Sequence, residues 1–102
     1  MKLFNIKVSP SAKSDLKDIT EYLSEFDHRI ATKYRNIIGD AIASLHTMPL
    51  RCPLVRDELL AEKGFRWIFA KNYVVFFTVD EENGIVYIER ILYSRMAYDV
   101  LL

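Results

Sequence analysis

The sequence predicts an α+β fold in which an N-terminal strand and an antiparallel two-helix hairpin precede a three-stranded antiparallel meander. Residues 10–45 carry apolar side chains at spacings of three and four, the period of an amphipathic helix. Residues 65–93 form short runs of β-branched and aromatic side chains separated by turn-forming residues. Helices and strands that follow one another in separate blocks are typical of α+β folds.

The first half of the chain is predicted to hold one strand and the two helices. Residues 3–8 alternate apolar and polar side chains, as a half-buried strand does. Ser9 and Pro10 mark a helix start, because serine caps helix N-termini and proline is favoured at the first helical position. Asp27 is expected to cap the second helix. Gly39 lies inside that helix, where we expect it to allow close approach of the first.

A connector and the meander make up the second half. Residues 48–55 contain two prolines and are expected to be irregular, while residues 56–63 fit either a loop or one helical turn. The predicted strands cover residues 65–70, 73–79 and 85–93. Asn72 is expected to supply the positive φ of a tight turn after the first of these strands, and Asn83-Gly84 is a strong hairpin signal.

The burial of the sheet is also predicted from its pattern. Residues 73–79 are apolar at nearly every position, which indicates a central strand or one covered on both faces. With both helices packed on one face, the opposite face is expected to be partly open and to serve as a binding surface.

Composition places the chain among globular proteins with a single domain, residues 1–102. It has 14 basic and 14 acidic side chains, whereas proteins that bind nucleic acid mainly through phosphates are usually strongly basic. No apolar run is long enough to span a membrane, and the N-terminus does not resemble a signal peptide. Cys52 is the only cysteine, expected to be a half-buried thiol, which fits a reducing cytoplasm.

No sequence motif predicts a metal site, a cofactor or a catalytic centre. The two histidines, His28 and His46, are expected at the surface near opposite ends of the second helix. Cations and phenols remain on the sheet and the tail: Arg66, Arg90, Tyr93, Arg95 and Tyr98. Guanidinium groups beside tyrosines suit the recognition of phosphate or carboxylate. We expect Arg66 and Arg95 to lie on the exposed face of the sheet. The alternative is that Arg66 and Arg90 form ion pairs with Glu62, Glu89 or the chain's carboxyl end.

The order of several short motifs resembles the RelE/ParE superfamily of toxins from type II toxin–antitoxin systems. Residues 9–16 resemble the family's opening S-P-x-A-x-x-D-L, and residues 72–80 resemble N-Y-R-I-F-Y-x-V-D. Residues 91–98 are similar to V-L-H-x-R-R-D-Y. Weaker likenesses lie at Tyr22-Leu23, residues 43–49, Pro53-Leu54-Val55 and Phe65-Arg66. The likeness covers essentially the whole chain.

The departures from that pattern bear on activity. Val74 stands where the family has an arginine, Tyr93 where it has a histidine, and Met96 where it has the second arginine of the tail. In the RelE branch, basic and aromatic residues at such positions promote cleavage of mRNA on the ribosome. The candidate catalytic residues that remain, if the chain is a nuclease, are Arg66, Arg95, Tyr93 and Tyr98.

The resemblance implies a toxin that is neutralised by a cognate antitoxin, with growth inhibition and plasmid stabilisation as its roles. The ParE branch binds DNA gyrase and needs no catalytic residues, and this is the function we expect. The alternatives are a RelE-like ribosome-dependent endoribonuclease and a degenerate member that binds only antitoxin. We expect the antitoxin to bury a helix against the toxin or to add a strand at a sheet edge. A homodimer or a heterotetramer with antitoxin is also expected.

Overall fold

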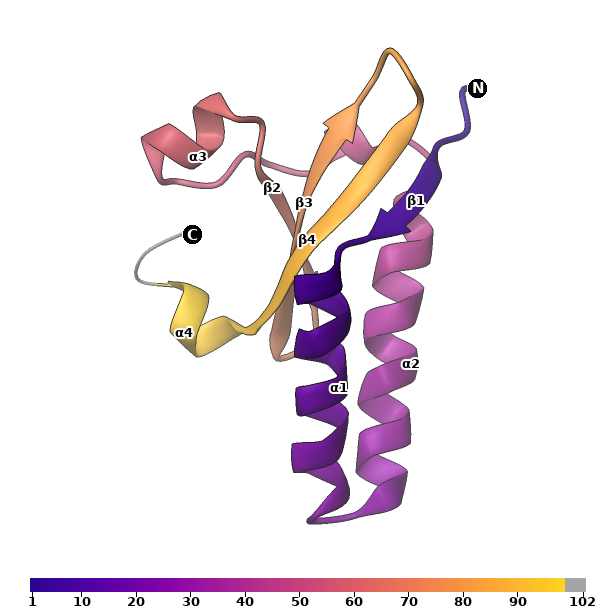
Figure 1. The fold of residues 1–102 in the computed structure, drawn as a ribbon, viewed down its shortest axis with the longest axis vertical. Coiled ribbons are helices and arrows are strands. Elements are labelled where there is room, and N and C mark those ends of the chain that lie inside the picture. The colour runs from indigo at the N-terminus through magenta and orange to yellow at the C-terminus, as the bar shows by residue number, and fades with distance from the viewer. Residues whose placement is uncertain (99–102) are drawn as a thin grey trace.

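A four-stranded mixed sheet carries a helical hairpin on one face (Figure 1). The computed structural model describes residues 1–98, apart from the side chain of Tyr98. The elements are β1 (Asn5–Val8), α1 (Pro10–Ser24), α2 (His28–Ser44), the 3₁₀ turn η1 (Pro49–Arg51), α3 (Glu58–Glu62), β2 (Arg66–Ala70), β3 (Tyr73–Asp80), β4 (Ile85–Tyr93) and α4 (Ser94–Tyr98). The strand order is β1-β4-β3-β2. The predicted α+β fold with its hairpin and antiparallel meander is confirmed, and β1 adds to the meander in parallel with β4.

Both helices of the hairpin begin at the capping residues that the sequence indicates. The Ser9 hydroxyl accepts the backbone N–H of Ala12 at 3.0 Å, and the Asp27 carboxylate accepts that of Arg29 at 2.7 Å. Each cap satisfies an N–H group that has no partner within its own helix. Side-chain caps therefore define where the two long helices start.

The sheet carries a core on each face. Between the sheet and the hairpin lies the larger core, which includes Ala12, Ile38, Leu45, Val75, Phe77 and Ile88. The smaller core lies on the other face and consists of Val55, Val74, Phe76 and Ala97, with Leu60, Phe65, Trp67 and Leu92 against it. The short helices α3 and α4 cover this core, while Phe69, which pairs with Val74 on the same face, remains 45% exposed, so the face is partly open as expected. The prediction that β3 is covered on both sides is confirmed.

Three local predictions need correction or completion. Gly39 is exposed and an added Cβ would meet nothing within 4 Å, so this glycine serves no helix–helix contact. Lys71, not Asn72, takes the positive φ of the β2–β3 turn, at 57°. Residues 56–63 contain the short helix α3, because the Asp57 carboxylate caps the N–H of Leu60 at 3.0 Å.

Within the described residues, no helix is both long and apolar enough to cross a membrane.

Candidate functional site

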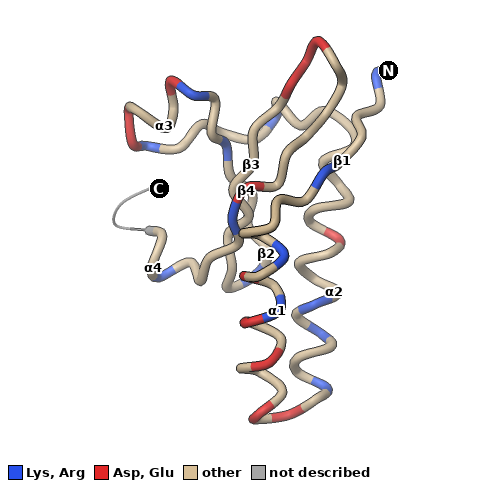
Figure 2. Tube along the Cα trace, viewed as in Figure 1, with Lys and Arg blue, Asp and Glu red and all other residues tan. Residues whose placement is uncertain are grey.

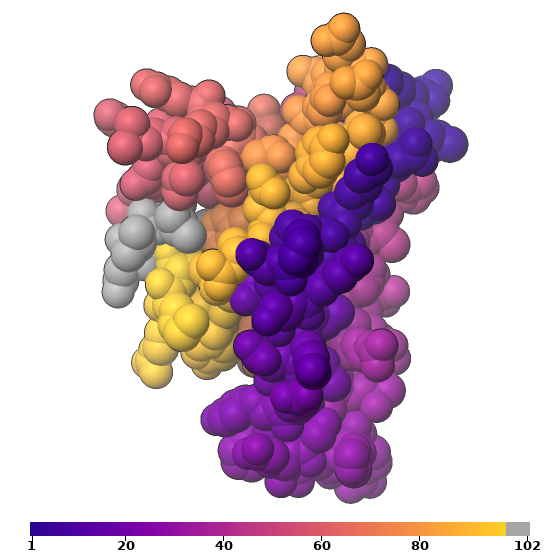
Figure 3. All heavy atoms as spheres, in the orientation of Figure 1, coloured from indigo at the N-terminus to yellow at the C-terminus, as the bar shows by residue number. Residues whose placement is uncertain are grey.

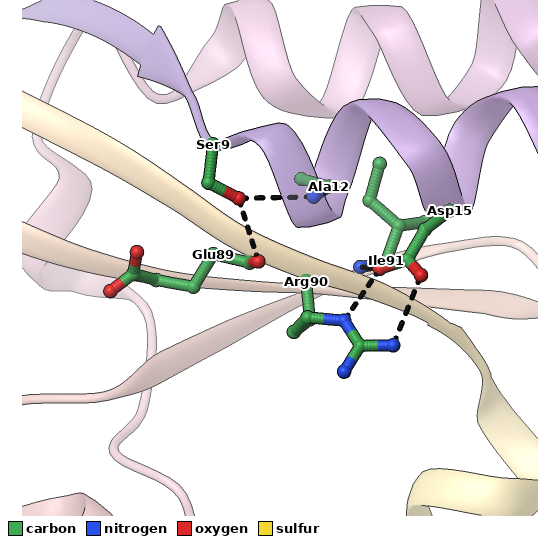
Figure 4. A network of polar contacts seen from close by, with 6 residues as sticks. All are labelled: Ser9, Ala12, Asp15, Glu89, Arg90 and Ile91. Atoms are coloured by element: carbon green, nitrogen blue, oxygen red, sulfur yellow. Dashed lines mark hydrogen bonds and ion pairs between the residues drawn. The ribbon is translucent and has the colours of Figure 1, made fainter.

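Helix α1 closes the edge of β4 beyond the point where β1 ends (Figure 4). The Ser9 hydroxyl donates to the carbonyl of Glu89 at 2.9 Å. Six residues further along the chain, the Asp15 carboxylate of α1 accepts the backbone N–H of Ile91 at 2.9 Å and the Nε–H of Arg90 at 2.7 Å. These bonds satisfy groups that would otherwise offer a free strand edge. They also fix the distance between the hairpin and the end of the sheet.

The end of the sheet, α4 and the projecting part of the hairpin enclose a groove of about 760 Å³. In Figure 3 the lower part of the hairpin projects beyond the sheet, and the groove opens between α1 and α4. Its lining is Asp15, Asp18, Ile19, Tyr22, Leu23, Ile30, Tyr34, Asn72, Tyr73, Arg90, Ile91, Leu92, Tyr93 and Met96. Apolar and aromatic side chains dominate this list, so the groove favours an apolar occupant.

Tyrosine rings form the wall of the groove on the side of α2 and β3. Tyr73 meets Tyr34 and Tyr93 edge to face, with ring centroids 5.6 Å and 5.7 Å apart. The Tyr34 hydroxyl accepts the amide of Asn72 at 2.7 Å, and the Lys71 ammonium lies 5.5 Å from the Tyr34 ring centroid. Burial raises the pKa of the Tyr73 phenol, which therefore stays neutral. The wall is a rigid aromatic surface of the kind that protein interfaces use as anchors.

The rim of the groove leaves large apolar side chains in water. Tyr22 is 59% exposed, Ile30 42%, Tyr93 43% and Met96 67%. Phe26 is 68% exposed beside them, edge to face with Tyr22 at 5.2 Å. Apolar surface gathered in one place marks an interaction site more often than singly scattered residues do. The groove is therefore the strongest candidate for a partner-binding site.

The structure does not bring the predicted catalytic residues together. Arg66 is half-buried at the start of β2, where its Nη1 donates to the carbonyl of Cys52 at 2.6 Å. Tyr93 and Arg95 are exposed at the opposite end of the sheet, and Tyr98 ends α4. Arg66 pairs across the sheet with Phe77, whereas Tyr93 pairs with Tyr73. The step from residue 73 to residue 77 along β3 is about 13 Å at ~3.3 Å per residue.

In the described residues the two sheet arginines pair with neither Glu62 nor Glu89, and the chain's carboxyl end, the third expected partner, lies outside those residues. Arg90 pairs with Asp15 rather than with a neighbouring glutamate, and the hydrogen bonds and charge of Asp15 raise the pKa of its guanidinium. Arg66 meets backbone carbonyls instead, those of Cys52 and, at 3.4 Å, Leu50. Arg66 therefore braces the connector and does not lie on an open face as expected.

The other candidate side chains show no catalytic arrangement in residues 1–98. Cys52 is more buried than expected, at 6% exposure, and burial raises the pKa of its thiol away from thiolate reactivity. His28 and His46 are exposed, as predicted. No group of three or more His, Cys, Asp or Glu side chains in the described part of the chain could hold a metal ion.

The residues that build the groove, above all Asp15, Tyr34 and Tyr73, were not predicted as site residues. Asp15 lies one position before the apolar Leu16, on the flank of α1 that meets β4. Tyr34 lies on α2, where its ring meets Tyr73 of β3. One signal in the sequence could have indicated the groove. Tyrosines occur both at the strand ends and on the helices that pack beside those ends.

Comparisons with known proteins agree with the fold. A family model described as ParE toxin of type II toxin-antitoxin system, parDE, matches residues 6–98. No curated protein sequence matches the chain. A structure of the chromosomal ParDE toxin–antitoxin system from P. aeruginosa is similar, with a TM-score of 0.72, 18% identity and coverage of 91% of this chain and 98% of that one.

A second similar structure is that of the toxin–antitoxin complex RelBE2 from Mycobacterium tuberculosis. It has a TM-score of 0.64 and 22% identity, and the match covers 89% of this chain and 98% of that chain. At these identities the two structures support the fold, while the family model spans nearly the whole chain. The chain therefore belongs to the ParE toxin family of type II toxin–antitoxin systems.

Proposed function

We propose that this toxin inhibits growth by binding DNA gyrase, and that it does not cut RNA. The observation that carries the proposal is the separation of the candidate nuclease residues. A transition-state clamp needs its cations within hydrogen-bond reach of one phosphate. Arg66 is instead tied to the carbonyls of the connector, at the end of the sheet away from Tyr93 and Arg95.

The position of Val74 supports the same conclusion. Its side chain is fully buried in the smaller core, packed with Phe76 and Leu92. The related ribonuclease pattern has an arginine at this position, but here a charge would be buried without a partner, which is strongly unfavourable. The burial of Val74 in the smaller core therefore supports the absence of a cation at this position. Removing one such group from a clamp can cost on the order of 10²–10³ in rate.

We further propose that the groove binds the cognate antitoxin as an amphipathic helix. Such a helix would place apolar side chains on Ile19, Tyr34 and Tyr93. Asp18 lies exposed on the α1 side of the groove, and Lys71 lies beyond Tyr34 on the other side. The helix should therefore carry basic residues along the edge that meets α1. Both similar structures are of toxin–antitoxin systems, which supports a partner of this kind.

We also propose that the toxin acts in the cytoplasm. With its antitoxin it forms a heterotetramer, and without antitoxin it forms a homodimer. The exposed apolar rim of the groove supports self-association in the absence of antitoxin.

The test is to induce the toxin in cells and to map transcript 5′ ends and gyrase-linked DNA breaks in the same culture. We expect DNA breaks and a DNA-damage response without new transcript ends. Codon-periodic transcript cuts without DNA breaks would establish the RelE-like alternative. If neither DNA breaks nor transcript cuts appear, growth is normal and the antitoxin binds tightly, the chain is a degenerate member that binds only antitoxin. An Arg95→Ala variant should stay toxic if no nuclease is involved, and lose toxicity if Arg95 assists cleavage.

A further inference from the structure

A cluster of cations lies on the flank of the hairpin that faces away from the groove. Lys13 and Lys17 of α1 and Arg35 of α2 line a hollow of about 280 Å³, together with Leu16, Thr20 and Glu21. We call the three cations and the space between them the cationic hollow. Lys13 and Lys17 precede the groove residues Asp15 and Ile19 by two positions each. Two positions correspond to about 200° around a helix, so the hollow and the groove lie on opposite flanks of α1.

None of the three cations of the hollow forms an ion pair with another of residues 1–98. Within that range the ion pairs are Arg29 with Asp27 and Arg90 with Asp15, and neither includes a residue of the hollow. Glu21 lines the hollow but lies beyond ion-pair distance of the three cations. Figure 2 shows acidic residues along α1 down to the hairpin tip and basic residues on the lower half of α2. Of the acidic residues on α1, Glu21 lines the hollow, and none forms an ion pair with its three cations.

The charges of the hollow are only partly balanced within α1. Lys13 and Lys17 are four residues apart, a spacing at which like charges repel, while Lys17 and Glu21 have the same spacing with opposite charges. Arg35 approaches the same space from the neighbouring helix. All three side chains are exposed, so their charges remain available to an external anion. The cluster has the character of a site that an anionic partner completes.

We propose that the cationic hollow binds the phosphate backbone of duplex DNA; this inference rests on the proposed function, because gyrase holds its DNA substrate as a duplex. Lys13 and Lys17 are ~6 Å apart along the axis of α1, at ~1.5 Å per residue. Successive phosphates of one DNA strand advance by ~3.4 Å, so the two long side chains can meet neighbouring phosphates. The planar guanidinium of Arg35 adds a donor pair that fits phosphate oxygens.

The location of the cationic hollow has a consequence for the antitoxin complex. Because the groove and the hollow lie on opposite flanks of α1, an antitoxin helix in the groove leaves the hollow open. Contact with DNA phosphates is therefore expected for the toxin with and without its antitoxin.

The direct test is binding of the purified full-length toxin to a short fluorescently labelled duplex, followed by anisotropy over a salt series. For three phosphate contacts, the slope of log K against log salt should be roughly −2 to −3, at ~0.9 per contact. The triple variant Lys13→Gln/Lys17→Gln/Arg35→Gln should reduce the slope nearly to zero. A matched control neutralises three exposed cations elsewhere, Lys7, Arg56 and Lys63, and should keep the wild-type slope.

Several outcomes would overturn the inference. The wild type could fail to bind the duplex at low salt, the triple variant could keep the wild-type slope, or the control could lose as much affinity as the triple variant. Circular dichroism should show that every variant is folded. A single Arg35→Lys variant, which keeps the charge, should retain most of the binding.

A second arm separates this inference from the proposed function. Toxin binding to gyrase is measured with and without DNA. If the wild type does not bind gyrase in either case, the proposed function fails, and the anisotropy series still decides the inference. If the triple variant binds DNA-free gyrase more weakly than the wild type does, the hollow contacts an acidic protein surface and the inference is wrong. The inference is supported if the triple variant binds DNA-free gyrase as tightly as the wild type does, but binds gyrase on DNA more weakly.

Discussion

The carboxylate of Asp15 holds the guanidinium of Arg90 in a two-point contact, with Oδ2 2.7 Å from Nε and Oδ1 3.0 Å from Nη2. The same Oδ2 also accepts the backbone N–H of Ile91. The Asp15 side chain is only 15% exposed, although that of Arg90 is 51% exposed. This contact joins α1 to β4 at the point where β1 no longer covers the strand edge, and both residues line the groove.

Replacing Asp15 with Asn should lower the free energy of unfolding by about 1–3 kcal/mol, the cost of a buried donor that loses a charged partner. Urea denaturation followed by circular dichroism measures this difference. Asp18→Asn is the matched control, because Asp18 is exposed on the same helix and should change stability by less than ~0.5 kcal/mol. Equal effects of the two substitutions would show that the contact with Arg90 and Ile91 contributes nothing.

Replacing Gly39 with Ala should stabilise the toxin by about 1 kcal/mol, because alanine favours the helix and nothing lies within 4 Å of the added Cβ. Gly64→Ala should instead destabilise it, since Gly64 has a φ of +84°. Thermal unfolding of the two variants checks the opposite signs. A loss of stability in Gly39→Ala would mean that the exposed face of α2 is not free in solution.

The groove should govern affinity for the antitoxin. Ile30→Asp places a charge on its apolar rim and should weaken antitoxin binding at least tenfold, about 1.4 kcal/mol. Isothermal titration calorimetry measures the affinity, and the antitoxin should raise the melting temperature of the wild type by several degrees through linkage. Leu59→Asp is the control, because Leu59 is 71% exposed on α3 and does not line the groove. If Leu59→Asp weakens binding and Ile30→Asp does not, the antitoxin binds over α3 instead.

Replacing Arg66 and replacing Arg95 should have different effects on the free energy of unfolding. Arg66→Ala removes a donor to the carbonyls of Cys52 and Leu50 and should lower the free energy of unfolding by about 1–3 kcal/mol. Arg95→Ala should leave stability within ~0.5 kcal/mol of the wild type, because its side chain is exposed on α4. Chemical denaturation of both variants decides this. An unchanged stability of Arg66→Ala would mean that Arg66 is available for a ligand.

Most of the element order could be predicted because its signals are local. Ser9 and Asp27 cap helices by accepting N–H groups that lie two or three residues away. Both partners of each cap therefore stand close together in the sequence. The apolar run of β3 likewise indicates burial on both faces without knowledge of what covers it. The turn at Lys71-Asn72 could not be predicted fully from local sequence, because either residue can take the positive φ. In the structure it is Lys71 that does so.

The candidate site could not be predicted in the same way, since its contacts join residues far apart in the chain. Asp15 contacts Arg90 and Ile91, and Tyr34 meets Tyr73, in a fold where β1 pairs with β4 and the hairpin lies against the sheet. Arg66 looked like a site residue because its position matched a family motif, but the fold directs its guanidinium to the connector.

The sequence by itself determined the fold class, the helix starts, the central strand and the family, because periodicity, caps and motif order depend on neighbours in the chain. The tertiary structure alone decided which residues share a surface. It separated Arg66 from Tyr93 along the sheet, covered Val74 with the smaller core and gathered tyrosines from α1, α2, β3 and β4 around one groove. The physical reason is that a groove is made where elements distant in sequence pack together, and strand pairing and helix packing set that geometry only in the folded chain.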